Sequence, residues 1–383
     1  MTALKVSSRI VYEKFARPMA RKAGDVPGSP SAITPEWLTA VLCAGTPGAA
    51  VADLKVELAS AGTHERHRLL VTYNDKGKNA GLPESIFTKS LPSIVTRMVA
   101  GFNGHARVEG LFYSQVRPLL NIEAPLCYYS TYDRRTFAAI HLLEDLIAAK
   151  SATFCGHKTN VTRAMAEDMI DLLASLHGQF YDAPVLKEQF RWLADYPRWF
   201  LIGAEKMRTE HYTQKAFDAA AAVIPDKLMA RRGEVWPATM RSLTVHQKES
   251  NVFLHSDVHI GNWYQSSSGR MGLCDWQCAS RGHWSRDFAY AVSAALTPED
   301  RRSWERDLLS RYLQRLAERT GQRFDFDQSF NWYRQQLLHA LAMWTITLRH
   351  SPLLPSMQSE PMTLTMMERM AIAIDDLGAL DSV

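Results

Sequence analysis

The sequence predicts an α+β protein, in which a five-stranded antiparallel sheet with one helix precedes a larger and mainly helical region. Three observations support this fold class. Short runs of alternating apolar and polar residues recur between residues 51 and 143, which is typical of half-buried strands. From about residue 147 onward, apolar residues recur mostly at helical spacing. One hairpin pattern, over residues 263–274, interrupts this helical region.

Local signals indicate the first helix and the first strand. Thr34 is a suitable N-cap and Pro35 a suitable first helical residue, so a helix is expected to begin there. Clean alternation over residues 51–59 predicts a strand that buries one of its two faces. Val56 and Leu58 are expected on the buried face, because the residues that alternate with them are charged or small.

Four further strands are predicted. Strands over residues 68–73 and 85–90 follow turn-forming residues and would form a meander with the first strand. Two more strands, over 128–132 and 137–143, are joined by a short charged turn. Between the third and the fourth strand, a helix is expected over residues 105–117, where a proline ends it.

The rest of the chain shows helical spacing. Helices are expected over residues 159–177, 297–320, 327–349 and 360–378. Gly178 is expected to end the first of them, because glycine is common just after a helix. No internal repeat is visible.

Length and composition limit the class of protein. A chain of 383 residues suits two domains rather than one simple core. With 46% hydrophobic and 22% charged residues, the composition is that of an ordinary soluble globular protein. The net charge of +4 is small, and no Lys/Arg run forms a nucleic-acid-binding stripe. We therefore expect no nucleic-acid partner.

Cysteines and apolar runs bear on the cellular compartment. Five cysteines at scattered positions argue against a disulfide framework and favour a reducing cytoplasm. No apolar run approaches the ~18 residues of a membrane span, and the N-terminus lacks a secretory signal. Residues 1–22 are basic and mildly amphipathic, which favours a docking or frayed terminal segment over an organelle-targeting peptide. A cytoplasmic protein without a membrane span is expected, and the oligomeric state stays open.

The stretch from residue 253 to Asn262, with Asp275 behind it, carries the candidate chemistry. Asp257 and Asn262 are five residues apart, which is the spacing of the D-x-x-x-x-N catalytic loop of kinases. Residues at the open end of a hairpin lie side by side. Asn262 and Asp275 can therefore offer an amide oxygen and a carboxylate to one hard cation. Phosphoryl transfer needs such a cation and a carboxylate that orients the attacking hydroxyl.

These residues form a recognisable signature. The pattern His255-x-Asp257-x-x-x-x-Asn262 followed by Asp275-Trp-Gln resembles that of the aminoglycoside phosphotransferases and the choline-kinase-like small-molecule kinases. The resemblance covers about residues 35–350. It implies a bilobal protein-kinase-like fold and ATP-dependent transfer of a phosphoryl group to a hydroxyl of a small molecule.

Protein kinases differ from this chain at two positions of the signature. They have arginine after the histidine and phenylalanine after the metal-binding aspartate, where this chain has Ser256 and Trp276. The resemblance also implies a division of the chain into three parts. Residues 1–33 would be an N-terminal extension and loop, residues 34–146 a nucleotide-binding N-lobe with its hinge, and residues 147–383 a C-lobe with the catalytic hairpin and the acceptor-binding helices.

The resemblance assigns roles within the catalytic stretch. Asp257 would act as the catalytic base or, more cautiously, as the residue that orients the acceptor hydroxyl. Asn262 and Asp275 would hold Mg²⁺. His255 is expected to be structural, with its ring bonded to backbone near Asp275. Asp287 would brace the catalytic loop.

Further roles concern the nucleotide. By resemblance, Lys89 would reach the α and β phosphates of ATP, and Glu109 would hold its ammonium group in place. The alternative is an exposed lysine at a strand end and an exposed helical glutamate. The Glu144 carbonyl and the Leu146 amide would pair with the edge of the adenine.

A loop between the first two strands is the candidate for phosphate binding. Ser60, Gly62 and Thr63 would offer backbone amides and hydroxyls to the phosphates. The loop has one glycine where the G-x-G-x-x-G motif of protein kinases has three. An ordinary hairpin turn is the alternative.

Other functions compete with a small-molecule kinase. A non-catalytic pseudokinase is the first alternative. A metallohydrolase that uses His255, Asp257 and His259 is the second, because alternate residues of a strand share one face. The late helices are rich in Arg, Leu, Met and Trp, which favours an apolar or neutral hydroxylated acceptor over a polycation. The sequence does not distinguish ATP from GTP.

Overall fold

The computed structural model describes residues 2–16, 18–60, 65–91, 93–351 and 356–383. The chain divides into two structural units. Unit 1 comprises Met1–Leu120, Ala124–Ala152 and Leu353–Met357, and unit 2 comprises Asn121–Glu123, Thr153–Pro352 and Gln358–Val383. Both units bury many apolar side chains.

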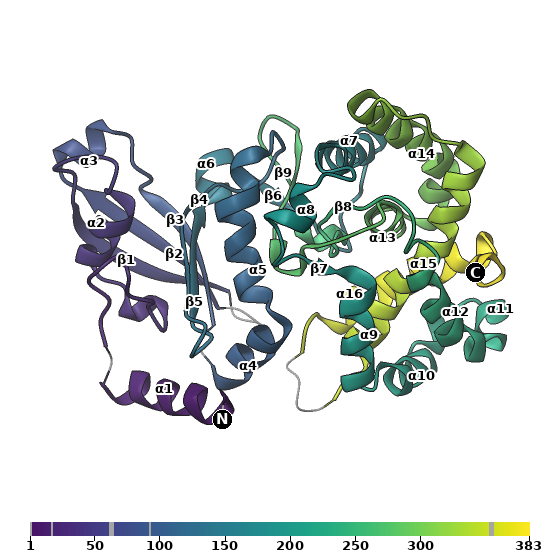
Figure 1. The fold of residues 1–383 in the computed structure, drawn as a ribbon, viewed down its shortest axis with the longest axis horizontal. Helices are drawn as coiled ribbons and strands as arrows, with labels where there is room; N and C mark the ends of the chain where they lie inside the picture. The colour runs from purple at the N-terminus through teal and green to yellow at the C-terminus, as the bar shows by residue number, and fades with distance from the viewer. Residues whose placement is uncertain (1, 17, 61–64, 92, 352–355) are drawn as a thin grey trace. The chain divides into compact units, whose positions relative to one another are not determined.

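Unit 1 is built on a five-stranded sheet with the strand order β1-β2-β3-β5-β4, in which all neighbours are antiparallel (Figure 1). The elements of unit 1 are α1 (Thr2–Ala16), η1 (Pro30–Ala32), α2 (Pro35–Leu42), β1 (Val51–Ser60), β2 (Glu65–Tyr73), α3 (Asp75–Asn79), β3 (Ser85–Ser90), α4 (Ile94–Asn103), α5 (His105–Leu111), η2 (Phe112–Val116), η3 (Arg117–Leu119), β4 (Cys127–Tyr132), β5 (Ala139–Glu144) and α6 (Leu146–Lys150).

The first predicted helix begins where its sequence indicates. The Thr34 side chain caps α2 by accepting a hydrogen bond from the Trp37 amide at 3.1 Å. Trp37 and Leu38 are fully buried in an apolar cluster with residues of the sheet. Since α2 packs against β1, this helix covers the first half of the edge strand.

The burial predicted for the second half of β1 is wrong. Val56 and Leu58 are exposed, and 66% of the Leu58 side-chain surface is accessible to solvent. Leu54 reaches the cluster beneath α2, whereas Val56 and Leu58 lie farther along the strand and are not part of it. The alternation in the sequence predicts the strand correctly, but it does not show how far the covering helix extends along it.

The sequence did not predict two features of residues 94–119. The helix α5 continues into a π-helical turn, η2, and then into the 3-10 helix η3. A separate helix, α4, precedes it and begins at a capping box formed by Ser93 and Thr96. The β-branched and glycine residues of α4 have low helix propensity, which explains why the sequence did not predict this helix.

Unit 2 is mainly helical and contains two small three-stranded sheets, β10-β9-β6 and β7-β11-β8. Its elements are β6 (Thr153–Phe154), α7 (Arg163–Gln179), α8 (Val185–Glu188), β7 (Ala194–Asp195), α9 (Tyr196–Lys206), α10 (Thr209–Ala219), η4 (Ala221–Val223), α11 (Asp226–Ala230), α12 (Arg232–Thr244), β8 (Val252–Leu254), η5 (Ile260–Asn262), β9 (Trp263–Gln265), β10 (Met271–Leu273), η6 (Trp276–Cys278), β11 (Ser280–Gly282), α13 (Ser285–Ala295), α14 (Pro298–Thr320), α15 (Phe326–Leu348), α16 (Glu360–Asp376) and η7 (Ala379–Ser382).

The predicted late helices correspond to α14, α15 and α16, whereas the end predicted for α7 is wrong. This helix runs through Gly178 to Gln179. A Cβ atom at Gly178 would lie 2.8 Å from the Arg319 side chain of α14, so the glycine permits close packing of the two helices. Glycine is therefore needed at this position because it has no side chain, and not because the backbone is left-handed there.

The fold class predicted from the sequence is confirmed. A five-stranded antiparallel sheet precedes a larger helical part, and the hairpin β9–β10 interrupts the helices of unit 2 (Figure 1). Within the described ranges of the chain, no helix combines the length and apolar character that crossing a membrane requires.

Candidate active site

One buried carboxylate, that of Asp287, holds the loop that follows β8. Asp287 of α13 accepts hydrogen bonds from the amide of His255 at 2.7 Å and from the amide of Ser256 at 2.9 Å. Ser256 has a left-handed backbone, with φ of 68°, a conformation that non-glycine residues rarely adopt. The two amide bonds stabilise this turn, so Asp287 braces the catalytic loop as expected.

His255 is held as a neutral ring. Its Nε2 atom lies 3.0 Å from the carbonyl oxygen of Cys274 and donates to it, and its Nδ1 atom accepts from the Asp257 amide at 3.2 Å. Burial lowers the pKa of His255, which agrees with a ring that has one donor and one acceptor nitrogen. The ring therefore connects the catalytic loop to the residue before Asp275.

Three side chains surround the Asp257 carboxylate. The amide group of Asn262 donates to Oδ2 at 3.2 Å and to the main-chain oxygen of Asp257 at 2.7 Å. The hydroxyl of Tyr290 donates to Oδ1 at 3.3 Å. Burial, followed by the charge of Asp257, raises the pKa of Tyr290 well above its usual value, so the hydroxyl keeps its proton and remains a donor. The Nε2 atom of His259 lies 3.8 Å from Oδ2.

Asn262 and Asp275 lie at the open end of the hairpin. The Cys274 amide donates to the carbonyl of Asn262 at 2.9 Å, which pairs the two strands up to the residue before Asp275. Because the nitrogen of the Asn262 side chain is bonded to Asp257, its oxygen Oδ1 remains for another partner. Asp275 has a φ of 65°, and such strained backbone is concentrated at functional sites.

The donors at this hairpin end fit Mg²⁺. This cation prefers oxygen ligands and is typically held by one or two carboxylates together with phosphate oxygens and water. The amide oxygen of Asn262, just before β9, and the carboxylate of Asp275, just after β10, are such donors. Within the described ranges, no group of three His, Cys, Asp or Glu side chains is arranged to hold a metal ion.

The geometry of His255 also bears on the metallohydrolase alternative. Both of its ring nitrogens make hydrogen bonds to backbone. His259 uses Nδ1 to accept from the Gly261 amide at 3.0 Å. A site with His255 as a metal ligand would have to break the bonds that shape the loop, so this arrangement favours the kinase interpretation.

Unit 1 contains the ion pair expected for nucleotide phosphates. The Lys89 ammonium lies 2.8 Å from each carboxylate oxygen of Glu109, and both side chains are buried. Gly110 lets α5 approach the sheet, since a Cβ atom there would lie 2.7 Å from the hydroxyl of Ser130. The alternative of an exposed lysine and an exposed glutamate is therefore wrong.

The predicted hinge is held by a residue that the sequence did not single out. Asp145 is buried and accepts hydrogen bonds from Arg68 at 2.5 Å and from Ser85 at 2.6 Å. It also caps α6. Leu146 is the first residue of α6, so its amide has no partner within the helix. Glu144 is the last residue of β5 and pairs with Ile86.

The candidate phosphate loop falls largely outside the described residues. Ser60 ends β1, and its side chain is not described. Gly62 and Thr63 lie outside the described residues. The role of this loop stays a prediction.

Tyr290 is a second residue that sequence reasoning missed. It lies three positions after Asp287 in α13, so the two side chains project from the same side of the helix. Both contact the catalytic loop, one through its carboxylate and the other through its hydroxyl. The three-residue spacing from Asp287 was a signal that could have indicated it.

The bracing by Asp287 gives a stability prediction. Asp287→Ala is expected to lower the free energy of unfolding by about 2–4 kcal/mol, because it leaves two buried amides without an acceptor. Urea unfolding would measure the change. Asp307→Ala is the control, since this carboxylate of unit 2 is 68% exposed and should change stability by less than about 0.5 kcal/mol. Equal effects of the two substitutions would contradict the bracing role.

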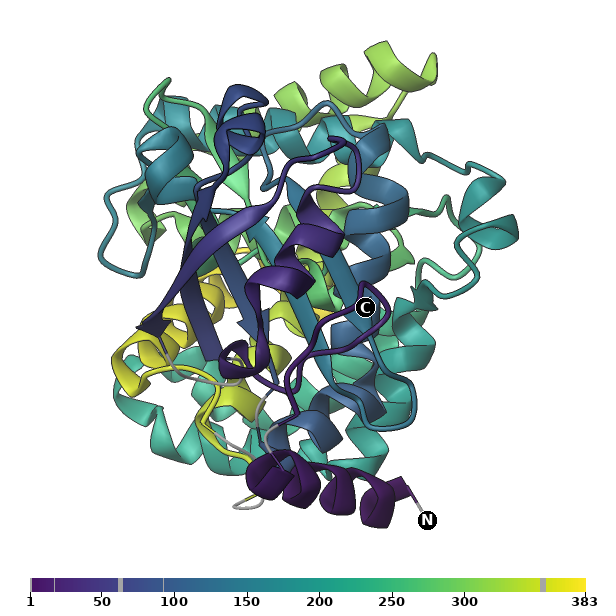
Figure 2. The ribbon, with the colours of Figure 1, turned by 90° about the vertical axis from the view of Figure 1, so that its left-hand side faces the viewer.

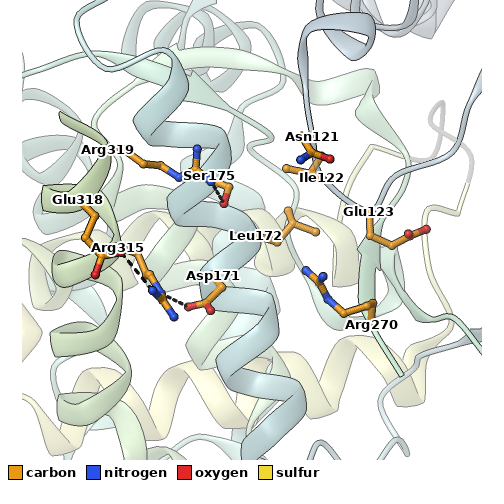
Figure 3. Close-up of a pocket in the computed structure, with 10 residues that line it drawn as sticks. All are labelled: Asn121, Ile122, Glu123, Asp171, Leu172, Ser175, Arg270, Arg315, Glu318 and Arg319. Carbon is orange, nitrogen blue, oxygen red and sulfur yellow. Dashed lines mark hydrogen bonds and ion pairs between the residues drawn. The ribbon is translucent and has the colours of Figure 1, made fainter. Parts of the chain in front are cut away.

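A separate hollow of about 240 Å³ lies between α7 and α14, and none of the predicted site residues lines it (Figure 3). Its charged walls pair with one another. Arg315 lies 3.1 Å from Glu318 and 3.5 Å from Asp171, and Arg319 donates to Ser175 at 2.9 Å (Figure 3). The contacts of Arg315 with Asp171 and of Arg319 with Ser175 join the two helices, and we assign no ligand to the hollow.

Comparisons with known proteins agree with this geometry. The profile of the phosphotransferase enzyme family matches residues 124–328, which is more than half of the chain. No curated protein matches the sequence. Fold and loop together define the class of a small-molecule phosphotransferase with a protein-kinase-like fold. The chain belongs to the phosphotransferase enzyme family.

One solved structure supports the fold assignment. A protein of Ralstonia eutropha JMP134, provisionally described as an aminoglycoside phosphotransferase, matches with a TM-score of 0.51 and 14% identity, over 90% of this chain and 97% of that chain. A macrolide 2'-phosphotransferase of Brachybacterium faecium matches with a TM-score of 0.45 and 15% identity, over 81% and 91%. A choline kinase of Streptococcus pneumoniae matches with a TM-score of 0.46 and 12% identity, over 85% and 95%. The last two TM-scores are too low to carry an argument.

Proposed function

We propose that this protein is an ATP-dependent O-phosphotransferase that acts on a hydroxyl of a small molecule. The observation that carries the proposal is the arrangement of Asp257 and Asn262 in one braced loop, with Asp275 two residues after the end of the paired strand β10. In the reaction, a bond forms between the acceptor oxygen and the γ-phosphorus. The bond from that phosphorus to the bridging oxygen breaks, and ADP leaves.

Asp257 is proposed to orient the acceptor hydroxyl and to take its proton. Its carboxylate is held in place by Asn262 and Tyr290, so little reorientation is needed when an acceptor binds. The phosphoryl-transfer transition state is loose, and positioning contributes more than basicity does. Because Tyr290 stays protonated, its hydroxyl remains a donor that holds Oδ1 of Asp257 in place.

Asn262 and Asp275 are proposed to hold Mg²⁺. When bound, this cation neutralises charge on the β and γ phosphates. The bond of 2.7 Å from the Asn262 side-chain nitrogen to the main-chain oxygen of Asp257 turns the amide oxygen away from Asp257, which leaves that oxygen for the metal. The same asparagine thus orients the carboxylate and supplies a metal ligand.

The nucleotide is proposed to bind through residues of the expected N-lobe, residues 34–146. Lys89, fixed by Glu109, would contact the phosphates, and the Glu144 carbonyl and Leu146 amide would pair with the base. The open first amide of α6 supports the last assignment. None of the five cysteines, all of which the structure describes, forms a disulfide, and a reducing cytoplasm is the proposed compartment.

The acceptor is proposed to be a neutral or partly apolar hydroxylated molecule. Aromatic rings gather beside Asp257: the ring of His259 lies 5.2 Å from that of Trp344 and 6.4 Å from that of Tyr290. These rings are buried, so the preference for an apolar or neutral acceptor over a polycation rests on the Arg-, Leu-, Met- and Trp-rich composition of the late helices. A pseudokinase remains the second candidate function.

Nucleotide-dependent stabilisation tests the proposal. ATP or GTP with Mg²⁺ is expected to raise the melting temperature of the wild-type protein, because ligand at 100 times its Kd stabilises by about 2.7 kcal/mol. Nucleotide without Mg²⁺ is the control and should give a smaller shift. Transfer of the γ-phosphate is then measured against a panel of hydroxylated acceptors. No shift with either nucleotide would contradict the proposal, and a shift without transfer to any acceptor would favour the pseudokinase.

A further inference from the structure

The N-terminal helix α1 is anchored to unit 1 by one of its faces. Val6 and Ile10 are buried on that face. The carboxylate of Glu13 accepts hydrogen bonds from the buried guanidinium of Arg97 in α4, at 2.6 and 3.3 Å. Arg97 also donates to the carbonyl of Gly28. Figures 1 and 2 both show α1 at the lower margin of unit 1, next to α4.

The opposite face of α1 presents large apolar side chains to solvent. Val11 and Tyr12 are about half exposed, and Phe15 is 86% exposed. At 3.6 residues per turn, these three residues fall within an arc of roughly 100° that lies opposite Val6 and Ile10. Helix α1 is therefore apolar on two sides, and one of them packs on its own unit.

Further exposed apolar residues belong to the neighbouring segments. Met19 follows α1, and Ile94 and Val95 lie at the start of α4, against which α1 packs. Exposed apolar side chains that occur singly are normal on a soluble protein, whereas a contiguous group indicates an interaction surface. Val11, Tyr12 and Phe15 share one face of α1, and that face indicates such a surface in unit 1.

The charge of the chain is also concentrated in this segment. Residues 1–22 contain six Lys or Arg and one acidic residue, which gives a net charge of +5, whereas the rest of the chain has a net charge of −1. The one acidic residue, Glu13, is turned inward to Arg97. Among the basic residues, Arg9 stacks over the ring of Tyr12, and Arg21 and Lys22 are exposed.

We propose that α1 docks on an anionic membrane surface. A helix that combines an apolar stripe with polar positions and basic flanks lies in the plane of the interface, with its apolar side in the boundary between headgroups and acyl chains. Phe15 and Tyr12 would enter this boundary, and the exposed Arg21 and Lys22 would face lipid phosphates and carboxylates, whereas Arg9 is paired with Glu13 at 3.0 Å. The positive charge selects an anionic surface over a neutral one.

This docking is reversible and depends on two contributions. One short apolar stripe gives weak binding by itself, and the basic residues add attraction that salt screens over about 10 Å. The anchor between Glu13 and Arg97 keeps α1 attached to unit 1 and fixes which face points outward. The whole enzyme, rather than a loose tail, would therefore be placed at the lipid surface.

Vesicle sedimentation of the full chain tests this inference. The wild-type protein is expected to bind vesicles of phosphatidylcholine with about 30–40% phosphatidylserine, roughly tenfold or more tightly than pure phosphatidylcholine vesicles at low salt. Phe15→Glu is expected to weaken this binding by about tenfold or more, because it removes a large apolar contact and adds a negative charge. High salt should weaken wild-type binding as well.

The control is Leu119→Glu, which places the same charge on a side chain of unit 1 that is 53% exposed outside α1 and α4. It is expected to bind anionic vesicles about as the wild type does. The inference is overturned if the wild type fails to bind anionic vesicles, or if the two variants bind equally. It is also overturned if the wild type is a dimer that binds no vesicles and Phe15→Glu is a monomer. The exposed face of α1 would then be covered by a second copy of the chain. Nucleotide-dependent stabilisation does not enter this test, so it is independent of the proposed function.

Discussion

Asp257→Ala is expected to lower the rate of phosphoryl transfer by roughly 10²–10⁴-fold, the usual contribution of a positioned general base. The carboxylate of Asp257 is placed to orient an acceptor hydroxyl, whereas the neighbouring His255 is bonded to backbone. Nucleotide binding should persist, because the proposed metal ligands are Asn262 and Asp275. Steady-state transfer to an acceptor from the panel measures the loss, and the melting temperature with nucleotide and Mg²⁺ measures retained binding.

Two variants accompany this measurement. Asp257→Asn keeps the shape and the bond from Tyr290 but removes the charge, so it should lose nearly as much activity as the alanine variant. Asp307→Ala changes an exposed carboxylate of the same unit and should leave the rate unchanged. Full activity in Asp257→Ala would refute the assigned role.

Asp275→Ala is expected to remove the Mg²⁺-dependent part of the nucleotide stabilisation, out of a total of about 2.7 kcal/mol for nucleotide with Mg²⁺ at 100 times its Kd. The loss follows from removing the charged ligand of the cation, while Asn262 alone would hold it weakly. Thermal melting with nucleotide, with and without Mg²⁺, makes the measurement. Transfer activity should fall in parallel.

The backbone at Asp275 requires a second variant. Alanine is strained in the left-handed conformation that Asp275 adopts, whereas asparagine tolerates it. Asp275→Asn therefore separates the loss of charge from a local change of the chain. If Asp275→Asn kept the full Mg²⁺-dependent shift, the metal role of Asp275 would be wrong. Asp257→Ala serves as the reciprocal control, since it should lose transfer and keep the shift.

Features that depend on short stretches of sequence were predictable. The hairpin was placed correctly because its strands, its turn and its flanking polar residues lie within residues 262–275. The N-cap of α2 depends on one side chain and an amide three residues away. The pair Lys89 and Glu109 was predicted from the positions of the two residues relative to a predicted strand and a predicted helix. In the structure, the Lys89 ammonium lies 2.8 Å from the Glu109 carboxylate.

Features that depend on tertiary packing were not predictable in this way. Val56 and Leu58 alternate like buried residues, but the extent of α2 decides which part of β1 is covered. Tyr290 reaches Asp257 across 33 positions of the chain, and Asp145 reaches Arg68 across 77. A single sequence predicts that such a residue lies on a helix or at the end of a strand. It does not predict which side chains from distant parts of the chain that residue contacts.

The burial of α13 has a consequence for how new specificities can arise in this protein. All 11 residues of this helix are buried, and it carries both the brace of the catalytic loop and the hydroxyl on Asp257. The carboxylate of Asp257 is thereby attached to a part of the molecule with little freedom to vary. If Asp257 has the proposed role, new acceptor specificities would arise from positions outside α13, while the chemistry is inherited unchanged. A saturation library would show this as intolerance along α13 beside tolerance at the exposed positions of helices such as α9 and α10.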